Sequence, residues 1–185
     1  MLEYVLVGVS LFIAGGLTWF LVRAWRRYET KLEQQRLQFE QIVRQTKEQI
    51  AQLPLEAVQA LAWEVLRSEW VLECEEADTS LPAELTYFPP TFRNLAARYK
   101  RIVFVGGAEL DLWGIQPSQW RSGCYRIGQS DEDATIELVI CPDTETVYEI
   151  YLFDSDALGR PKVESYPTIY HWIVVENKVM SDLPA

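Results

Sequence analysis

An uncharged stretch near the N-terminus constrains this chain more than any other feature of its sequence. Residues 4–22 contain no charged side chain. A helix rises about 1.5 Å per residue, so these residues would extend about 28 Å, close to the hydrocarbon thickness of a bilayer, about 30 Å. Tyr4 and Trp19 lie near the two ends of the stretch, where interfacial aromatic residues gather. We therefore predict an N-terminal transmembrane helix over residues 1–22.

The residues that flank this stretch predict its orientation. Arg23, Arg26 and Arg27 follow it directly, whereas only Met1-Leu2-Glu3 precedes it. Basic residues beside a span stay on the cytoplasmic side, so we expect the N-terminus outside and the rest of the chain in the cytoplasm. The three arginines would lie at the interface, beside lipid headgroups. A cleaved signal peptide would need a basic start and a small-residue cleavage site, and the sequence shows neither.

The next segment predicts a helical stalk. Residues 23–53 contain no glycine or proline and are rich in Gln, Glu, Arg and Lys. Two sets of residues spaced seven apart form a weak seam: Leu32, Phe39 and Thr46, and Gln35, Ile42 and Gln49. Because two seam positions are glutamine, we expect a solvated spacer helix, and a short coiled coil that joins two copies is the alternative.

Residues 54–185 form the acidic part of the chain. They carry ten Lys or Arg against 22 Asp or Glu, whereas the whole chain has a net charge of −10. Such a surface repels phosphate backbones, which argues against nucleic acid and favours a basic protein partner. Apolar residues make up 49% of the chain, enough for a packed core.

The order of apolar patterns in this part predicts an α+β domain. Helical spacing marks three segments, and short apolar runs mark four strands, of which the last two form a hairpin. The predicted helices cover residues 55–70, 91–99 and 165–175, and the predicted strands cover residues 102–105, 125–128, 135–141 and 146–153. Residues 73–80 read as an acidic loop. The expected architecture is an antiparallel sheet packed with helices.

Three stretches of this domain resemble the SUKH superfamily, which includes the yeast cell-wall synthesis regulator and many bacterial toxin-immunity proteins. They correspond to an entry helix with prolines and aromatics, a central hairpin and a closing helix: residues 88–95, 127–148 and 165–173. The resemblance covers about residues 85–175. It implies a binding scaffold without catalytic residues. The predicted anchor and stalk depart from the usual soluble member, so an ordinary immunity role fits less well.

The sequence contains no familiar catalytic or cofactor motif. It has no nucleotide-binding glycine pattern, no nucleophile elbow and no H-E-x-x-H. With one histidine, a multi-histidine metal site is excluded. Three cysteines without a C-x-x-C argue against a disulfide framework or a zinc site, and favour a reducing compartment. We predict no catalytic residues, metal or cofactor. The alternative is an enzyme of unrecognised type that uses His171 as a base or Cys124 as a nucleophile.

Two acidic loops are the candidate partner-binding sites. One contains Asp131, Glu132 and Asp133, and the other contains Asp154 and Asp156. Exposed acids of this kind can form a docking face for a basic partner, although solvated turns or a calcium loop are alternatives. We therefore expect a membrane-anchored, non-catalytic protein-interaction module. The second hypothesis is an immunity protein that binds and neutralises a basic toxin.

Overall fold

The computed structural model divides the chain into two units, Met1–Gln45 and Thr46–Ala185. The structure describes the backbone of residues 2–130, 135–155 and 159–181. It describes the side-chain surroundings of residues 22–130, 135–155 and 159–179.

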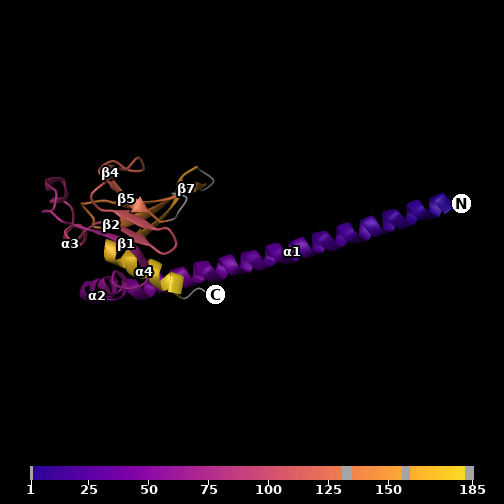
Figure 1. Ribbon diagram of the computed structural model, residues 1–185, viewed down its shortest axis with the longest axis horizontal. Helices are drawn as coiled ribbons and strands as arrows, with labels where there is room; N and C mark the ends of the chain where they lie inside the picture. Colours follow the sequence, from indigo (N-terminus) through magenta and orange to yellow (C-terminus); the bar gives the residue numbers. More distant parts are fainter. Residues whose placement is uncertain (1, 131–134, 156–158, 182–185) are drawn as a thin grey trace. The chain divides into compact units, whose positions relative to one another are not determined.

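The first unit is one helix. Helix α1 (Leu2–Ala51) runs through it and continues into the second unit, as Figure 1 shows. The prediction of a continuous helix beyond residue 22 is therefore confirmed. Side chains one turn apart pair along its surface: Trp25 Nε1 donates to Glu29 Oε1 at 2.7 Å, and Arg36 Nε lies 3.0 Å from Glu40 Oε1. Such pairs stabilise an exposed helix by a few tenths of a kcal/mol each.

The predicted membrane span lies almost entirely outside the residues whose side chains are described. Only Val22 belongs to both. Within the described part of the chain, no helix has the length and apolar character needed to cross a membrane. The span over residues 4–22 therefore stays a prediction.

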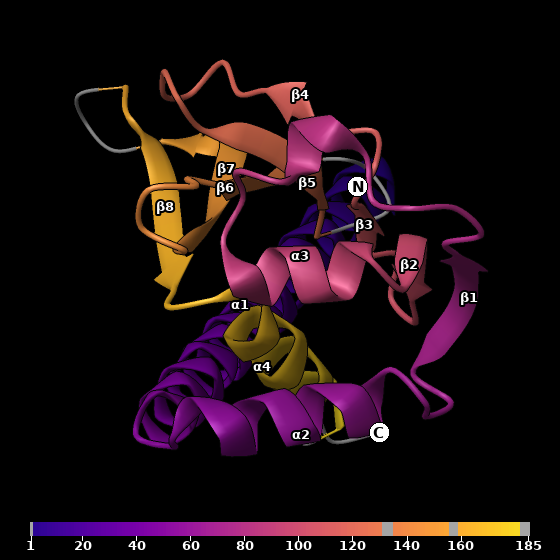
Figure 2. The same cartoon turned by 90° about the vertical axis from the view of Figure 1, so that its left-hand side faces the viewer.

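The second unit is an α+β domain with an antiparallel sheet, as predicted. Helices α2 (Leu55–Val65), α3 (Pro90–Ala96) and α4 (Ile169–Ser181) lie together on one side of the sheet, with α4 between α2 and α3 (Figure 2). A short 3₁₀ turn, η1 (Ala83–Leu85), precedes α3. Helix α4 packs centrally, and the ring of its Trp172 meets Phe104 edge-on at 5.7 Å between centroids. The core therefore lies between this helical layer and the sheet.

The sheet is antiparallel throughout, in the order β1-β2-β3-β5-β6-β7-β8, and β4 pairs with β5 outside this path. Its strands are β1 (Val71–Glu76), β2 (Tyr99–Phe104), β3 (Glu109–Asp111), β4 (Gln116–Pro117), β5 (Tyr125–Gln129), β6 (Ile136–Ile140), β7 (Val147–Ser155) and β8 (Pro161–Tyr166). Alternate residues face the helices, and most of them are apolar and buried: Ile102, Leu110, Leu138, Ile140 and Val147.

Several element predictions were wrong. The acidic loop expected over residues 73–80 begins as strand β1, which forms one edge of the sheet and pairs only with β2 among the described strands. Its acidic side chains are tolerated because an edge strand keeps most of them in solvent. Strand β8 was not predicted. Helix α2 ends at Val65 instead of near Trp70, because a turn leads directly into β1.

The expectation that the cysteines form no disulfide was also wrong. Cys124 and Cys141 are disulfide-bonded, and Cys74 is free. The register of β5 and β6 pairs Tyr125 with Ile140, which places the two cysteines opposite each other with their Cα atoms 4.3 Å apart. An odd number of cysteines does not prevent one close pair. The bond lies on the sheet face opposite the helices, in a small apolar cluster with Val139 and Ile150.

Candidate functional site

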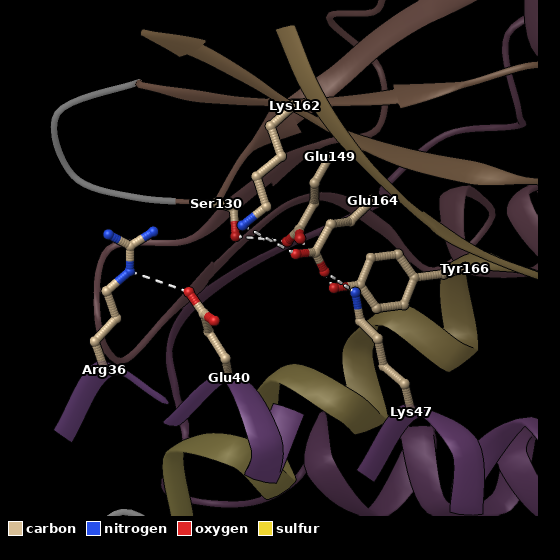
Figure 3. A network of polar contacts seen from close by, with 8 residues as sticks. All are labelled: Arg36, Glu40, Lys47, Ser130, Glu149, Lys162, Glu164 and Tyr166. Atoms are coloured by element: carbon tan, nitrogen blue, oxygen red, sulfur yellow. Dashed lines mark hydrogen bonds and ion pairs between the residues drawn. The ribbon is translucent and has the colours of Figure 1, made fainter. Parts of the chain in front are cut away.

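The most developed polar site of the domain is built around Glu149 of β7, between the sheet and α4 (Figure 3). Glu149 is only 3% exposed. Oε1 accepts hydrogen bonds from Ser130 Oγ and Trp172 Nε1, both at 2.9 Å, and Oε2 accepts one from the Tyr166 hydroxyl at 2.9 Å. Three donors can offset the cost of burying a charge. Glu149 thereby connects the end of β5, strand β8 and helix α4.

A partly buried ion pair lies beside this carboxylate. Lys47, in the last turns of α1 and within the second unit, pairs with Glu164 of β8, and Lys162 Nζ lies 3.4 Å from the same carboxylate (Figure 3). Lys47 Nζ also lies 4.1 Å from the centre of the Tyr166 ring. Burial alone would raise the pKa of Glu164, but the two ammonium groups outweigh it and lower that pKa. These contacts attach the end of α1 to the sheet.

Another carboxyl group, Glu176 of α4, has a raised pKa, in contrast to Glu164. Burial, and then repulsion from Glu149, raises its pKa to about 8, so it holds a proton at neutral pH. Glu176 lines a cavity of about 50 Å³ together with Ser130 and Asn177. The remaining lining is largely apolar and includes Trp70, Phe104 and Ala108. The Asn177 Nδ2 atom is buried without a hydrogen-bond partner among the described residues.

Glu149 and Glu176 therefore lie close enough to repel each other, and the pKa of Glu176 is raised in part by this repulsion. Neighbouring carboxyl groups, one of them with a raised pKa, also occur in catalytic sites. Here the Glu149 side chain is almost completely buried and accepts hydrogen bonds from three donors of its own chain. A substrate could not touch it in this conformation. The arrangement is better suited to joining elements of the fold than to catalysis.

The residues of the enzyme hypothesis have structural surroundings. His171 is buried at the start of α4, where its Nδ1 lies 2.9 Å from Thr168 Oγ1, and burial lowers its pKa. Cys124 is disulfide-bonded and is not a free nucleophile in this form. Cys74 is half-buried, and burial together with the charge of Glu76 raises the pKa of its thiol. None of these side chains is activated in the way that a catalytic base or thiolate requires.

Most of the predicted docking residues cannot be placed. Asp131, Glu132, Asp133 and Asp156 lie outside the described residues. Asp154 is exposed near the end of β7. The three membrane-interface arginines, Arg23, Arg26 and Arg27, are exposed on α1.

The structure instead describes an acidic edge on β1 that the sequence analysis treated as a loop. Glu73, Glu75 and Glu76 are exposed on this strand, and Asp78 follows it. Two basic residues of β2 pair with part of this set. Lys100 Nζ lies 2.6 Å from Asp78 and 3.7 Å from Glu75, and Arg101 is 4.0 Å from Glu73. Arg101 also binds Glu109 at 2.6 Å, so the edge keeps an excess of negative charge.

A polar groove lies on the sheet face opposite the helices. It has a volume of about 190 Å³, and its lining includes Glu109, Asp111, Gln116, Arg126 and Gln129. Its charged groups are engaged with neighbours: Asp111 Oδ1 accepts from the Gly114 amide at 2.7 Å, and Arg126 Nε lies 3.9 Å from Glu137. The groove could accept a small polar group, but its charged side chains already contact residues of the same chain.

No family model matches this chain, and neither a curated protein nor a solved structure matches it. The resemblance to the SUKH superfamily therefore stays a prediction. The features of the chain that bear on its function are the exposed face of α1, the acidic edge of β1 and the buried carboxyl groups.

Proposed function

We propose that this chain is a membrane-anchored, non-catalytic protein-interaction module whose acidic domain binds a partner with a basic surface. The observation that carries the proposal is the exposed acidic edge strand β1. The strand lies at the end of the sheet, so one row of its backbone amides and carbonyls faces away from β2. Edge strands of this kind can accept an extended segment of another protein as an added strand.

The side chains of β1 indicate which segment would fit. Glu73, Glu75 and Glu76 would flank an added strand with negative charge, while the exposed Leu72 offers an apolar contact. A basic segment would be attracted to this edge, and an acidic one would be repelled. Electrostatic complementarity also raises the rate of association, because opposite charges guide the approach of the partner.

The N-terminal part of the chain supports the anchoring half of the proposal. Residues 4–22 are uncharged and long enough for a span, and Arg23, Arg26 and Arg27 follow them. We place the domain on the cytoplasmic face because basic residues beside a span stay on that side. Confinement to a membrane raises the effective concentration of the domain near partners in the same membrane.

The test is affinity capture of the full-length tagged protein from detergent-solubilised membranes. The test variant carries Glu73→Gln, Glu75→Gln and Glu76→Gln. The control variant removes three acids that are exposed elsewhere, Glu56→Gln, Glu84→Gln and Asp143→Asn. Both variants lose the same charge, so a general electrostatic effect would act equally on both.

The proposal expects one abundant partner with a basic segment, lost from the β1 variant and kept by the control. Equal binding to the two variants would exclude the β1 edge as the docking site. Recovery of no partner above background from wild-type membranes would overturn the interaction proposal. Recovery of a basic toxin would support the same edge but would favour the immunity hypothesis.

A further inference from the structure

The exposed part of α1 carries a regular apolar stripe. Trp25, Leu32 and Phe39 fall seven residues apart, and Tyr28 lies three residues after Trp25. These four side chains are between 40% and 63% exposed, although they are among the largest apolar residues of the chain. Every described side chain from residue 22 to residue 41 is exposed, so no described part of the chain covers the stripe.

A stripe of this kind is costly for a helix that stands alone. Most helical stability in proteins comes from packing an apolar face, and regularly spaced apolar side chains on a surface mark an interface. A seven-residue spacing is the pattern that a second helix satisfies, because two helices that supercoil around each other meet every 3.5 residues. The stripe therefore fits a helical partner better than a flat surface.

The same stripe continues into the second unit, where its residues are buried. Thr46 follows Phe39 by seven residues and is buried, and Ile50 one turn later is buried as well. The C-terminal end of the repeat thus packs within its own domain. The preceding part is exposed from Trp25 to residue 41, and Ile42 is half-buried.

We propose that residues 25–42 of α1 pair with the same residues of a second copy, as a parallel two-stranded coiled coil. Trp25, Leu32 and Phe39 would occupy the a positions, and Tyr28, Gln35 and Ile42 the d positions. Two copies carry the same stripe, so in a parallel pair each a or d residue faces the same residue of the other copy. The parallel orientation rests on the proposed membrane anchor, because two copies inserted by their N-termini leave the bilayer in the same direction. Gln35 would meet its counterpart and fix the register.

Contact with lipid headgroups would cover only part of the stripe. Trp25 and Tyr28, next to the three arginines, could lie among headgroups. Leu32 and Phe39 lie seven and 14 residues beyond Trp25, which is about 10 and 20 Å along the helix at about 1.5 Å per residue. At these distances, Phe39 would lie beyond the headgroup region in which Trp25 would lie.

The flanking charges make the pairing weak and dependent on confinement. Lys31 of one copy would approach Arg36 of the other, which is unfavourable in this register. Arg36 is already paired with Glu40 at 3.0 Å, and this contact reduces the repulsion. Because both copies would be held in one membrane, a weak seam can still form dimers.

The test is cysteine crosslinking of the full-length protein in native membranes. Cys74→Ser removes the unpaired thiol, and single cysteines are then introduced at each position from 31 to 42. The Cys74→Ser chain without an introduced cysteine measures any background dimer that forms through Cys124 or Cys141. Mild oxidation followed by non-reducing electrophoresis measures the dimer fraction at each position. We expect maxima at 32, 35, 39 and 42, several-fold above the intervening positions. Leu37→Cys is the matched control, because Leu37 is apolar and 58% exposed but lies off the seam.

Three results would overturn the proposal: no dimer at any position, a yield without the seven-residue period, or maxima on the face of Leu37. As a second measurement, Phe39→Asp should reduce crosslinking through Gln35→Cys several-fold, whereas Leu37→Asp should leave it unchanged. Both residues are exposed on α1, so neither change threatens the fold of the second unit. Fractionation of the same samples reports separately whether the chain is in the membrane, and the capture experiment tests the β1 edge independently of the seam.

Discussion

Replacing Glu149 tests whether the buried carboxylate network holds the domain together. Glu149→Ala removes the acceptor of three hydrogen bonds at once, from Ser130, Tyr166 and Trp172. The indole of Trp172 is buried in the core and cannot turn toward water. A buried donor left without a partner costs about 1 to 3 kcal/mol. With three donors affected and partial rearrangement of the two hydroxyls, we expect a loss of about 4 kcal/mol in the free energy of unfolding.

Glu149→Gln provides an intermediate case. The amide keeps one oxygen as an acceptor, and the hydroxyls of Ser130 and Tyr166 can reorient to accept from its NH₂ group. The charge-assisted part of the bonds is lost, and hydrogen bonds to ionised groups are about twice as strong as neutral ones. We therefore expect a loss of about 1 to 2 kcal/mol, clearly less than for Glu149→Ala.

The assay is urea unfolding of the full-length protein in mild detergent, followed by tryptophan fluorescence and far-UV circular dichroism. Glu137→Gln is the control, because Glu137 lies on the adjacent strand β6 and its contact with Arg126 is long, at 3.9 Å. Contacts of that kind contribute about 0 to 1 kcal/mol. If Glu149→Ala cost no more than this control, the network would not stabilise the fold and our reading of Glu149 would be refuted.

Three further predictions follow from individual contacts. Because the pKa of Glu176 in the folded protein is raised to about 8 from 4.5, the native state holds a proton that the unfolded state has lost. Stability should therefore fall as the pH rises from about 5 to about 8, and Glu176→Gln, measured by unfolding at several pH values, should abolish this slope. A parallel slope in the variant would assign it to other groups. Gly114→Ala would place a Cβ atom 2.0 Å from the Asp111 carboxylate, so that carboxylate would have to move. We expect the free energy of unfolding, measured in urea, to fall by about 1 to 2 kcal/mol. An unchanged free energy of unfolding would contradict this crowding. Finally, acid trapping followed by alkylation in denaturant counts the free thiols of each chain. We expect three free thiols if the domain lies in a reducing cytoplasm. One free thiol would show that the Cys124–Cys141 bond persists and that the domain faces an oxidising compartment.

Local patterns predicted the elements whose signals are local. Helix α1 beyond the predicted span follows from a long run without glycine or proline, and the β6–β7 hairpin follows from two apolar runs around a proline-containing turn. Strand β1 has the sequence of a poor strand, because glutamate is depleted in sheets. Its pairing with β2 depends on residues that lie about 30 positions away in the chain. Neither propensity nor periodicity contains that information.

The site at Glu149 was missed for a similar reason, although one signal was present. Its partners come from β8, α4 and the residue after β5, so the network exists only once the sheet has formed. The strand alternation places Glu149 on the same face as the buried Val147. A charged residue on a face predicted to be buried requires partners. That conflict could have identified Glu149 as a candidate, but not the three donors that bind it.

The disulfide and the three arginines favour different compartments for the domain, but the geometry of the sheet is compatible with both. Persistent disulfides belong to oxidising compartments, whereas Arg23, Arg26 and Arg27 favour the cytoplasm. The amides of Cys124 and Cys141 donate to Arg121 and Thr146, so the two cysteines form a pair without mutual hydrogen bonds. Such pairs bring side chains closest together in an antiparallel ladder. The β5–β6 register therefore holds the thiols side by side without the bond, and the fold is compatible with a reduced pair in the cytoplasm.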